Sequence, residues 1–226
     1  MRVLIFGGTG MVGQAVLREC LLDAGIDRVI LVGRTASAAT DAKVEQHVVA
    51  DVTVLDAIRP AIETADVCFW CLGVSSAGLG EAAYRRITRE LAVGAATALA
   101  AWNPAMTFVF VSGTGADSTE RGRVMWARVK GETENALFRL PFKAVHAVRP
   151  AFIQPRHGIT SRTALYRAFY LVTAPLFPIF RRLTPGAVTT TEDLGRAMIA
   201  LARHGAEKRV LEQPDLNALV PKVAAA

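Results

Sequence analysis

A glycine-rich turn near the start of the chain has the residue types and the spacing needed to hold a phosphate. Gly7, Gly10 and Gly13 follow the apolar run 2–6 and precede an apolar stretch with helical spacing. Gly7 lets the chain turn sharply, Gly10 lets the backbone approach a pyrophosphate, and Gly13 lets a helix pack closely on a sheet. The start of that helix would present free N–H groups and partial positive charge to phosphate oxygens. Strand, turn and helix in this order predict a dinucleotide site, the alternative being a tight turn without a ligand.

Arg34 stands at the position that distinguishes two dinucleotides, the end of the second predicted strand. The sequence there reads Leu31-Val32-Gly33-Arg34-Thr35. NAD-binding sites usually place an acid at this position, whereas a basic residue accommodates the 2′-phosphate of NADP. A guanidinium can make paired, charge-assisted hydrogen bonds to a phosphate. We therefore expect NADP(H) as the cofactor, with NAD(H) as the alternative.

Cys68 and Cys71 form a C-x-x-C, a spacing used in redox and metal sites. Redox use requires a helix N-terminus that lowers the thiol pKa, but residues 66–72 read as a buried strand, on which positions three apart face opposite sides. No further soft ligands are spaced for a metal. We expect two small core residues and no metal.

The cysteine count and the opening residues bear on location. The chain has three cysteines, an odd number, and its opening is too short in apolar residues for a signal peptide. We therefore expect a reducing, cytoplasmic location.

The charge of the chain restricts its partners. The net charge of +6 comes mainly from arginines scattered among acids, without a nucleic-acid-binding motif, so we expect a small-molecule substrate and no nucleic acid. The apolar and aromatic stretch 162–183 contains Arg167, Pro175 and Pro178, which argues against a transmembrane span. Contact with a membrane surface stays open as a weaker alternative.

Strand-like apolar runs alternate with helical stretches through the first two thirds of the chain. The predicted strands cover 2–6, 29–32, 44–49, 67–72, 107–111 and 144–148, and the predicted helices cover 11–22, 54–63, 81–102 and 124–140. This alternation implies right-handed crossovers and a mainly parallel sheet in a doubly wound α/β fold. We expect a single domain over 1–226, with about 151–190 as a small C-terminal segment that covers the substrate. The run 189–194 predicts one more helix, capped by a threonine.

The spacing Gly7-x-x-Gly10-x-x-Gly13 resembles that of the extended and atypical short-chain dehydrogenases/reductases, and within them the chain looks most like the Tat-interactive-protein-like group of NAD(P)-binding oxidoreductases. The resemblance implies a Rossmann fold in which residues 51–52 contact the adenine, 72–74 pass along the nucleotide, and an Arg-Pro at 149–150 lies beside the nicotinamide. The full set of expected cofactor-binding residues is Gly7, Thr9, Gly10, Met11, Val12, Gly13, Arg34, Asp51, Val52, Leu72, Gly73, Val74, Lys130 and Pro150.

The resemblance also implies a set of catalytic residues, with one departure. Relatives use a Ser or Thr after the fifth strand and the tyrosine and lysine of a Tyr-x-x-x-Lys motif. Ser112 and Thr114 follow the fifth strand here, and Lys130 matches the lysine, but Trp126 stands where the tyrosine would. An indole N–H donates a hydrogen bond but does not give up its proton near neutral pH, so Trp126 cannot be a general acid.

Three routes stay open at this point. Lys130 could act as the acid if burial lowers its pKa. Tyr166 or Tyr170 could reach the site from the later segment. The third route is that the chain holds its cofactor without turnover. The expected function is therefore an NADP(H)-dependent oxidoreductase acting on a mostly apolar carbonyl substrate under 162–183, and the alternative is a catalytically silent NADP(H)-binding regulator. The sequence is compatible with a monomer or a homodimer.

Overall fold

The fold is built on a seven-stranded sheet in which every neighbouring pair is parallel. The computed structural model describes residues 1–160 and 185–220. The strand order is β3-β2-β1-β4-β5-β6-β9. The strands are β1 (Arg2–Phe6), β2 (Arg28–Gly33), β3 (Val44–Val48), β4 (Val67–Trp70), β5 (Thr107–Val111), β6 (Ala144–Arg149) and β9 (Val210–Glu212). This is the doubly wound order of a Rossmann fold, and it confirms the predicted class.

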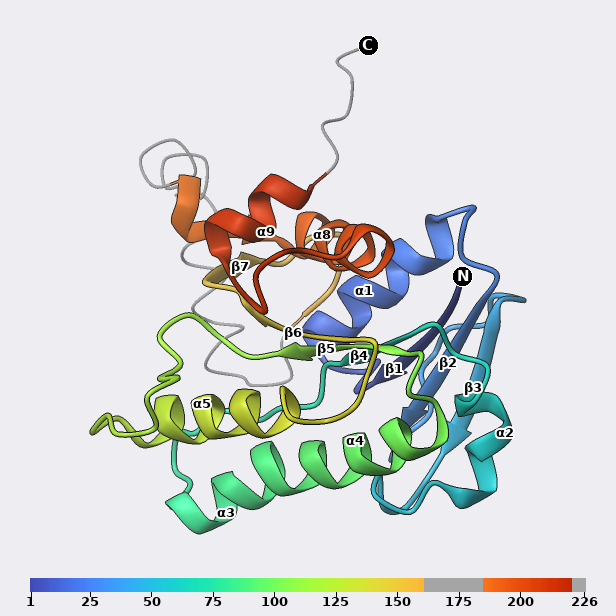
Figure 1. Ribbon diagram of the computed structural model, residues 1–226. Helices are drawn as coiled ribbons and strands as arrows, with labels where there is room; N and C mark the ends of the chain where they lie inside the picture. Colours follow the sequence, from blue (N-terminus) through green and yellow to red (C-terminus); the bar gives the residue numbers. More distant parts are fainter. Residues whose placement is uncertain (161–184, 221–226) are drawn as a thin grey trace.

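Helices cover both faces of the sheet (Figure 1). One face carries α1 (Met11–Leu22), α8 (Thr191–His204) and α9 (Gln213–Leu219). The other carries α2 (Arg59–Ile62), which follows the 3-10 turn Asp56–Ile58, together with α4 (Leu91–Trp102) and α5 (Met125–Leu137). The two layers enclose the sheet, which explains why its strands read as continuous apolar runs.

Successive side chains along each strand point to opposite faces of the sheet, so the sheet has a separate hydrophobic core on each face. Val3 and Ile5 of β1 pack against the α1–α8 layer, and Leu4 and Phe6 pack against the α4 layer; all four are fully buried. An aromatic series crosses the second core, because the ring of Trp70 lies 4.7 Å from that of Phe6 and 6.3 Å from that of Phe108.

The two C-x-x-C cysteines face opposite sides of the sheet, as the strand interpretation predicts. Cys68 lies in the core under α4, and Cys71 packs against the core under α1. Burial raises the pKa of the Cys71 thiol to about 12 and that of Cys68 well above its ordinary value, so neither is a thiolate near neutral pH. Within residues 1–160 and 185–220, no group of three or more His, Cys, Asp or Glu side chains is arranged to hold a metal.

The predicted helix 81–102 is interrupted by a π-helical turn. It consists of α3 (Glu81–Arg85), the π turn Arg86–Glu90 and α4. Such turns insert one extra residue in a helix and are common near functional sites. The predicted helix 124–140 is shorter than expected and ends at Leu137.

The C-terminal part adds a second, small sheet. β7 (Phe152–Gln154) pairs in parallel with β8 (Val188–Thr190), which follows the 3-10 turn Pro185–Ala187. The Thr190 side chain accepts a hydrogen bond from the Asp193 N–H and caps α8, as predicted. The stretch 162–183, with Tyr166 and Tyr170, lies almost wholly at 161–184, outside the described residues.

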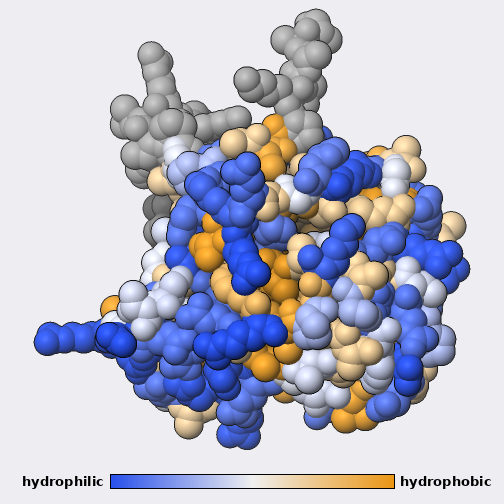
Figure 2. Space-filling model, in the orientation of Figure 1, coloured by the Kyte–Doolittle hydropathy of each residue, from blue (hydrophilic) through white to orange (hydrophobic). Residues whose placement is uncertain are grey.

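Hydrophilic residues dominate the face shown in Figure 2, around a narrower apolar strip near its centre. Among the ion pairs of the described part of the chain, Arg85 pairs with Glu132 and Arg128 pairs with Glu81. No helix in the described part of the chain is long and apolar enough to cross a membrane.

Candidate functional site

The glycine turn is closed by backbone contacts that leave no room for side chains at two positions. Gly7 has a φ of +82°, and a β-carbon there would lie 2.9 Å from the backbone of Cys71 and Leu72. A β-carbon on Gly13 would lie 2.1 Å from the Gly7 carbonyl oxygen. At Gly10, which precedes α1, the nearest atom would be 3.5 Å away, an ordinary contact. The turn therefore needs Gly7 and Gly13 to fold, whereas a side chain at Gly10 would occupy space above the helix N-terminus.

A cavity of about 600 Å³ opens beside this turn, within the size range of small-molecule sites. It lies at the carboxyl ends of β1 to β4, where the strand order reverses between β1 and β4. Its lining includes ten of the predicted cofactor-binding residues: Gly7, Thr9, Gly10, Met11, Arg34, Asp51, Val52, Leu72, Gly73 and Val74. Val12, Gly13, Lys130 and Pro150 are not part of this lining.

Some residues of the lining carry no signal in the sequence. Ile87 comes from the π turn, and Leu91 begins α4, so the long helix forms an apolar wall of the cavity. Ala50, Cys71 and Ser75 are neighbours in sequence of predicted residues. The π turn could not be read from the sequence because its residues are ordinary helix formers.

Arg34 and Asp51 lie at the end of the cavity formed by β2 and β3. The Arg34 side chain is exposed. Oδ1 of Asp51 accepts hydrogen bonds from the Thr53 N–H (2.8 Å) and hydroxyl (2.7 Å), which hold the pKa of that carboxyl below its usual range. Asp51 therefore stabilises a turn and lines the cavity at the same time.

The predicted catalytic hydroxyls both donate hydrogen bonds within the protein. Ser112 is buried, and its Oγ donates to Oε1 of Glu134 at 2.5 Å. Thr114 is exposed, and its Oγ1 donates to the Arg149 carbonyl oxygen at 2.9 Å. A hydroxyl has one proton, so in this arrangement neither group has a proton to offer a substrate carbonyl.

Lys130 is partly buried on α5, beneath the end of β5. Its Nζ lies 3.4 Å from the Val111 carbonyl oxygen and 5.6 Å from the centre of the Phe110 ring. Burial lowers the pKa of Lys130 to about 8, while the nearby carboxylate of Glu134 acts in the opposite direction. A lysine with this pKa holds a proton at neutral pH and can release it more readily than an ordinary one.

Trp126 lies one helical turn before Lys130 and packs on the turn that follows β5. A β-carbon on Gly115, whose φ is +90°, would lie 3.3 Å from the Trp126 ring. The indole ring thus packs against the backbone of this turn. Tyr84, the tyrosine in the described part of the chain, is buried on α3.

A buried ion pair contacts Ser112, one of the predicted catalytic residues. Glu134 is fully buried and forms two hydrogen bonds with Arg149. Arg149 also binds Glu212 and Ser118. Sequence reasoning missed Glu134, although an acid four residues after Lys130 among the buried positions of α5 was an available signal.

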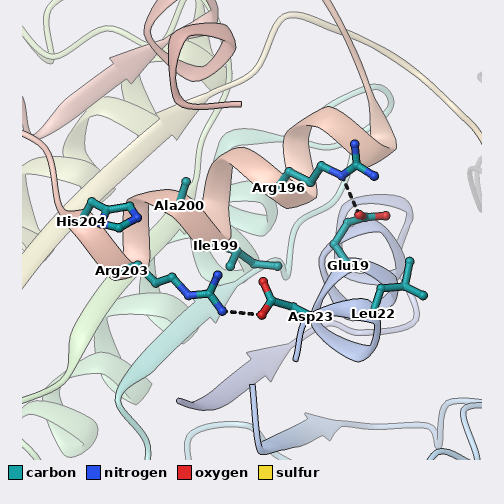
Figure 3. Close-up of a pocket in the computed structure, with 8 residues that line it drawn as sticks. All are labelled: Glu19, Leu22, Asp23, Arg196, Ile199, Ala200, Arg203 and His204. Carbon is teal, nitrogen blue, oxygen red and sulfur yellow. Dashed lines mark hydrogen bonds and ion pairs between the residues drawn. The ribbon is translucent and has the colours of Figure 1, made fainter. Parts of the chain in front are cut away.

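A second cavity, of about 320 Å³, lies between α1 and α8 (Figure 3). Its charged side chains bind one another across the two helices, Arg196 to Glu19 at 3.1 Å and Arg203 to Asp23 at 2.5 Å. It lies toward the carboxyl end of α1, away from the glycine turn. Because these charges are paired, we assign them to packing of the two helices.

Comparison with sequence families identifies the family to which this chain belongs. The family model described as NAD(P)H-binding matches residues 7–143. Protein HTATIP2 of Rattus norvegicus is 31% identical over 154 residues, covering 67% of this chain and 62% of that protein. The Leucinostatins biosynthesis cluster protein T of Purpureocillium lilacinum is 29% identical over 164 residues, covering 70% and 60%. The matched part of the chain thus spans less than two thirds of the length of these relatives.

Solved structures share the fold at low sequence identity. The Bordetella bronchiseptica enzyme WbmF in complex with NAD+ is 17% identical, with a TM-score of 0.64 over 96% of this chain and 76% of that one. The UDP-glucose 4-epimerase of Thermotoga maritima, with UDP-glucose, is 15% identical, with a TM-score of 0.62 over 88% and 72%. These structures support the Rossmann architecture.

Proposed function

This chain belongs to the NAD(P)H-binding family, and on that premise we propose that it is an NADP(H)-dependent oxidoreductase of the atypical short-chain type. The observation that carries the proposal is the convergence of ten predicted residues, from separate segments of the chain, on one cavity beside the glycine turn. A ligand that touches all of these segments must be elongated, as a dinucleotide is.

In this proposal the cofactor lies along the carboxyl ends of the strands. The space above Gly10 and the start of α1 receives the pyrophosphate, since a helix N-terminus offers free N–H groups there. Arg34 binds the 2′-phosphate, and Asp51 and Val52 border the adenine. We place the nicotinamide end toward Lys130 and Pro150, which lie outside the lining of this cavity. When bound, the nicotinamide supplies or accepts a hydride.

Lys130 is the proposed proton donor. It is the residue of the predicted catalytic set whose proton is available near neutral pH, since Ser112 and Thr114 donate their hydroxyl protons within the protein. Ser112 and Thr114 then shape the wall of the reaction site. We propose an apolar carbonyl substrate, and the support is an exposed apolar residue, Val124, at the start of α5 beside Met125 and Trp126.

The second candidate function is an NADP(H)-binding regulator without turnover. The observation that favours it is Trp126, which fills the position of the expected acid and cannot release a proton. Both candidates require the cofactor site, and they differ only in hydride transfer.

Consumption of NADPH separates the two candidates. The purified chain is given NADPH and a panel of apolar aldehydes, ketones and quinones, each of which can accept a hydride. The oxidoreductase proposal expects turnover that Lys130→Ala abolishes and that Lys143→Ala, at an exposed lysine before β6, leaves unchanged. Tight NADPH binding with no turnover on any of these substrates would establish the regulator instead.

The proposal extends to the location of the protein in the cell and to its oligomeric state. We propose a cytoplasmic protein, supported by three free cysteines, one of them partly exposed. It acts on a small molecule as a monomer or a homodimer, which light scattering on the purified chain distinguishes. Salt-sensitive binding to anionic vesicles would point instead to a membrane-surface role.

A further inference from the structure

Glu134 occupies an environment that tolerates a carboxylate only when its oxygens are bonded. The residue is fully buried in the layer between α5 and the sheet. Its Oε1 accepts from Ser112 Oγ at 2.5 Å and from Arg149 Nε at 2.9 Å, and its Oε2 accepts from Arg149 Nη2 at 2.5 Å. Buried carboxylates are kept charged by such partners.

Arg149 carries these contacts to the two chain segments that border the proposed reaction site. Its Nη1 donates to Glu212 at 2.9 Å, and its Nη2 also donates to Ser118 Oγ at 2.6 Å. Its carbonyl oxygen accepts from Thr114 Oγ1, and the next carbonyl, that of Pro150, accepts from the Thr114 N–H at 3.1 Å. The Glu134–Arg149 pair therefore connects the turn after β5 to the end of β6.

We infer that Glu134 is a positioning residue of this site: it fixes Ser112 and Arg149, and from one helical turn away it stabilises the ammonium of Lys130. The inference rests on the proposed function, in which Lys130 is the proton donor. Glu134 has no contact with solvent, so it acts through its neighbours and does not exchange a proton with the substrate.

Among the groups around Lys130, the carboxylate of Glu134 is the charge that favours the protonated form of the lysine. From β5 come the Phe110 ring and the Val111 carbonyl, and from α5 comes the Glu134 carboxylate. The guanidinium of Arg149 on β6 is compensated by Glu134 and Glu212. Burial is already the larger effect on the Lys130 pKa, and removing the negative charge of Glu134 would leave it unopposed and favour the neutral amine.

The pKa of Lys130, measured by NMR on reductively ¹³C-methylated protein and assigned with Lys130→Arg, tests the inference without any need for turnover. In Glu134→Gln the pKa of Lys130 should fall by about one pH unit or more. If the protein turns over, the pH at which its activity falls as the general acid loses its proton should decrease as well. The matched control is Glu132→Gln, on the same helix, which loses a pair with Arg85 and should leave Lys130 unchanged.

A double variant, Glu134→Gln with Arg149→Met, keeps the test valid if the single variant does not fold, because it removes both charges of the buried pair together. The Lys130 pKa should again fall, but by less than in the single variant, because a positive charge is removed together with the negative one. A pKa equal to that of the wild type in a folded Glu134 variant overturns the inference and leaves the proposed cofactor site intact. Wild-type protein that binds no NADPH overturns the proposed function, whereas the NMR titration still decides the role of Glu134.

Discussion

The β-carbon that Gly13 lacks would lie 2.1 Å from the carbonyl oxygen of Gly7. The first turns of α1 are therefore pressed directly on the loop that leaves β1. Gly10 lies between them in sequence but has ordinary space around its α-carbon. Gly7 and Gly13 are thus needed for the fold of the turn, whereas Gly10 is needed only for the space that a ligand would occupy.

Two alanine substitutions should separate these demands. Gly13→Ala should destabilise the fold by about 3 kcal/mol, because backbone must move to accommodate the methyl group. Gly10→Ala should cost no more than about 1 kcal/mol in stability and still weaken NADPH at least about tenfold, because the methyl group fills the proposed phosphate space. Urea unfolding and NADPH titration of both variants provide the test. A stable Gly13→Ala variant with wild-type affinity would refute this account of the turn.

Lys130 should make the fold less stable than an apolar residue would. Its pKa is lowered from 10.5 to about 8, so the folded state disfavours the charged form. Below about pH 8 both states hold the proton and the cost is present in full; between there and about pH 10.5 the unfolded chain binds the additional proton, so stability rises with pH. Lys130→Met should be more stable than the wild type by about 1 kcal/mol near pH 7.

Urea unfolding of the wild type and of Lys130→Met at about pH 7 and about pH 9.5 measures this difference. Other titrating groups cancel because both proteins contain them. The advantage of the methionine should shrink at the higher pH. A stability difference of the same size at both pH values would contradict the lowered pKa of Lys130.

Trp126→Tyr should introduce a general acid at the position where the resemblance to short-chain reductases leads us to expect one. The phenol would stand one helical turn before Lys130 and close to the Gly115 turn. A positioned acid contributes about 10²-fold or more, so carbonyl reduction should rise at least about tenfold. Trp126→Phe is the control, since it makes the same reduction in size without the hydroxyl. Equal rates in the two variants would mean that this position does not reach the substrate.

Much of this fold could be predicted from the sequence because its strands are covered on both faces. Arg2–Phe6 and Val67–Trp70 are apolar over nearly their whole length, and α1 has the bounds that its periodicity predicts. β9 could not be found, because only Val210 and Leu211 of its three residues are apolar. A strand this short is recognised only when β6 is beside it.

The candidate site divides along the same line. Most of the predicted cofactor residues lie in local motifs at strand ends, so their positions along the chain predict that they meet at one edge of the sheet. Glu134 and Arg149 are fifteen positions apart in sequence and lie on different elements, and Glu212 follows sixty-three residues after Arg149. Such pairs depend on packing in three dimensions, which a local pattern does not contain.

The buried acid on α1 should be more important for stability than its neighbour at the surface. Glu19 is 4% exposed and binds Arg18 and Arg196, whereas Asp23 and Arg203 are about a quarter and a third exposed. Glu19→Ala should cost about 2 kcal/mol, and Arg203→Ala less than about 1 kcal/mol. Thermal and urea unfolding of both variants measure the ranking. The reverse order would show that the α1–α8 packing depends on the outer pair.

The central claim is that the cavity beside the glycine turn binds NADP(H) and that Arg34 recognises its 2′-phosphate. Calorimetric titration of NADPH and NADH into the wild type and Arg34→Ala tests it most directly. We predict tighter binding of NADPH by the wild type, and about a 10- to 100-fold loss for NADPH in Arg34→Ala with little change for NADH, as expected when charge-assisted hydrogen bonds are removed. An equal loss for both dinucleotides, or no binding of either by the wild type, would contradict it.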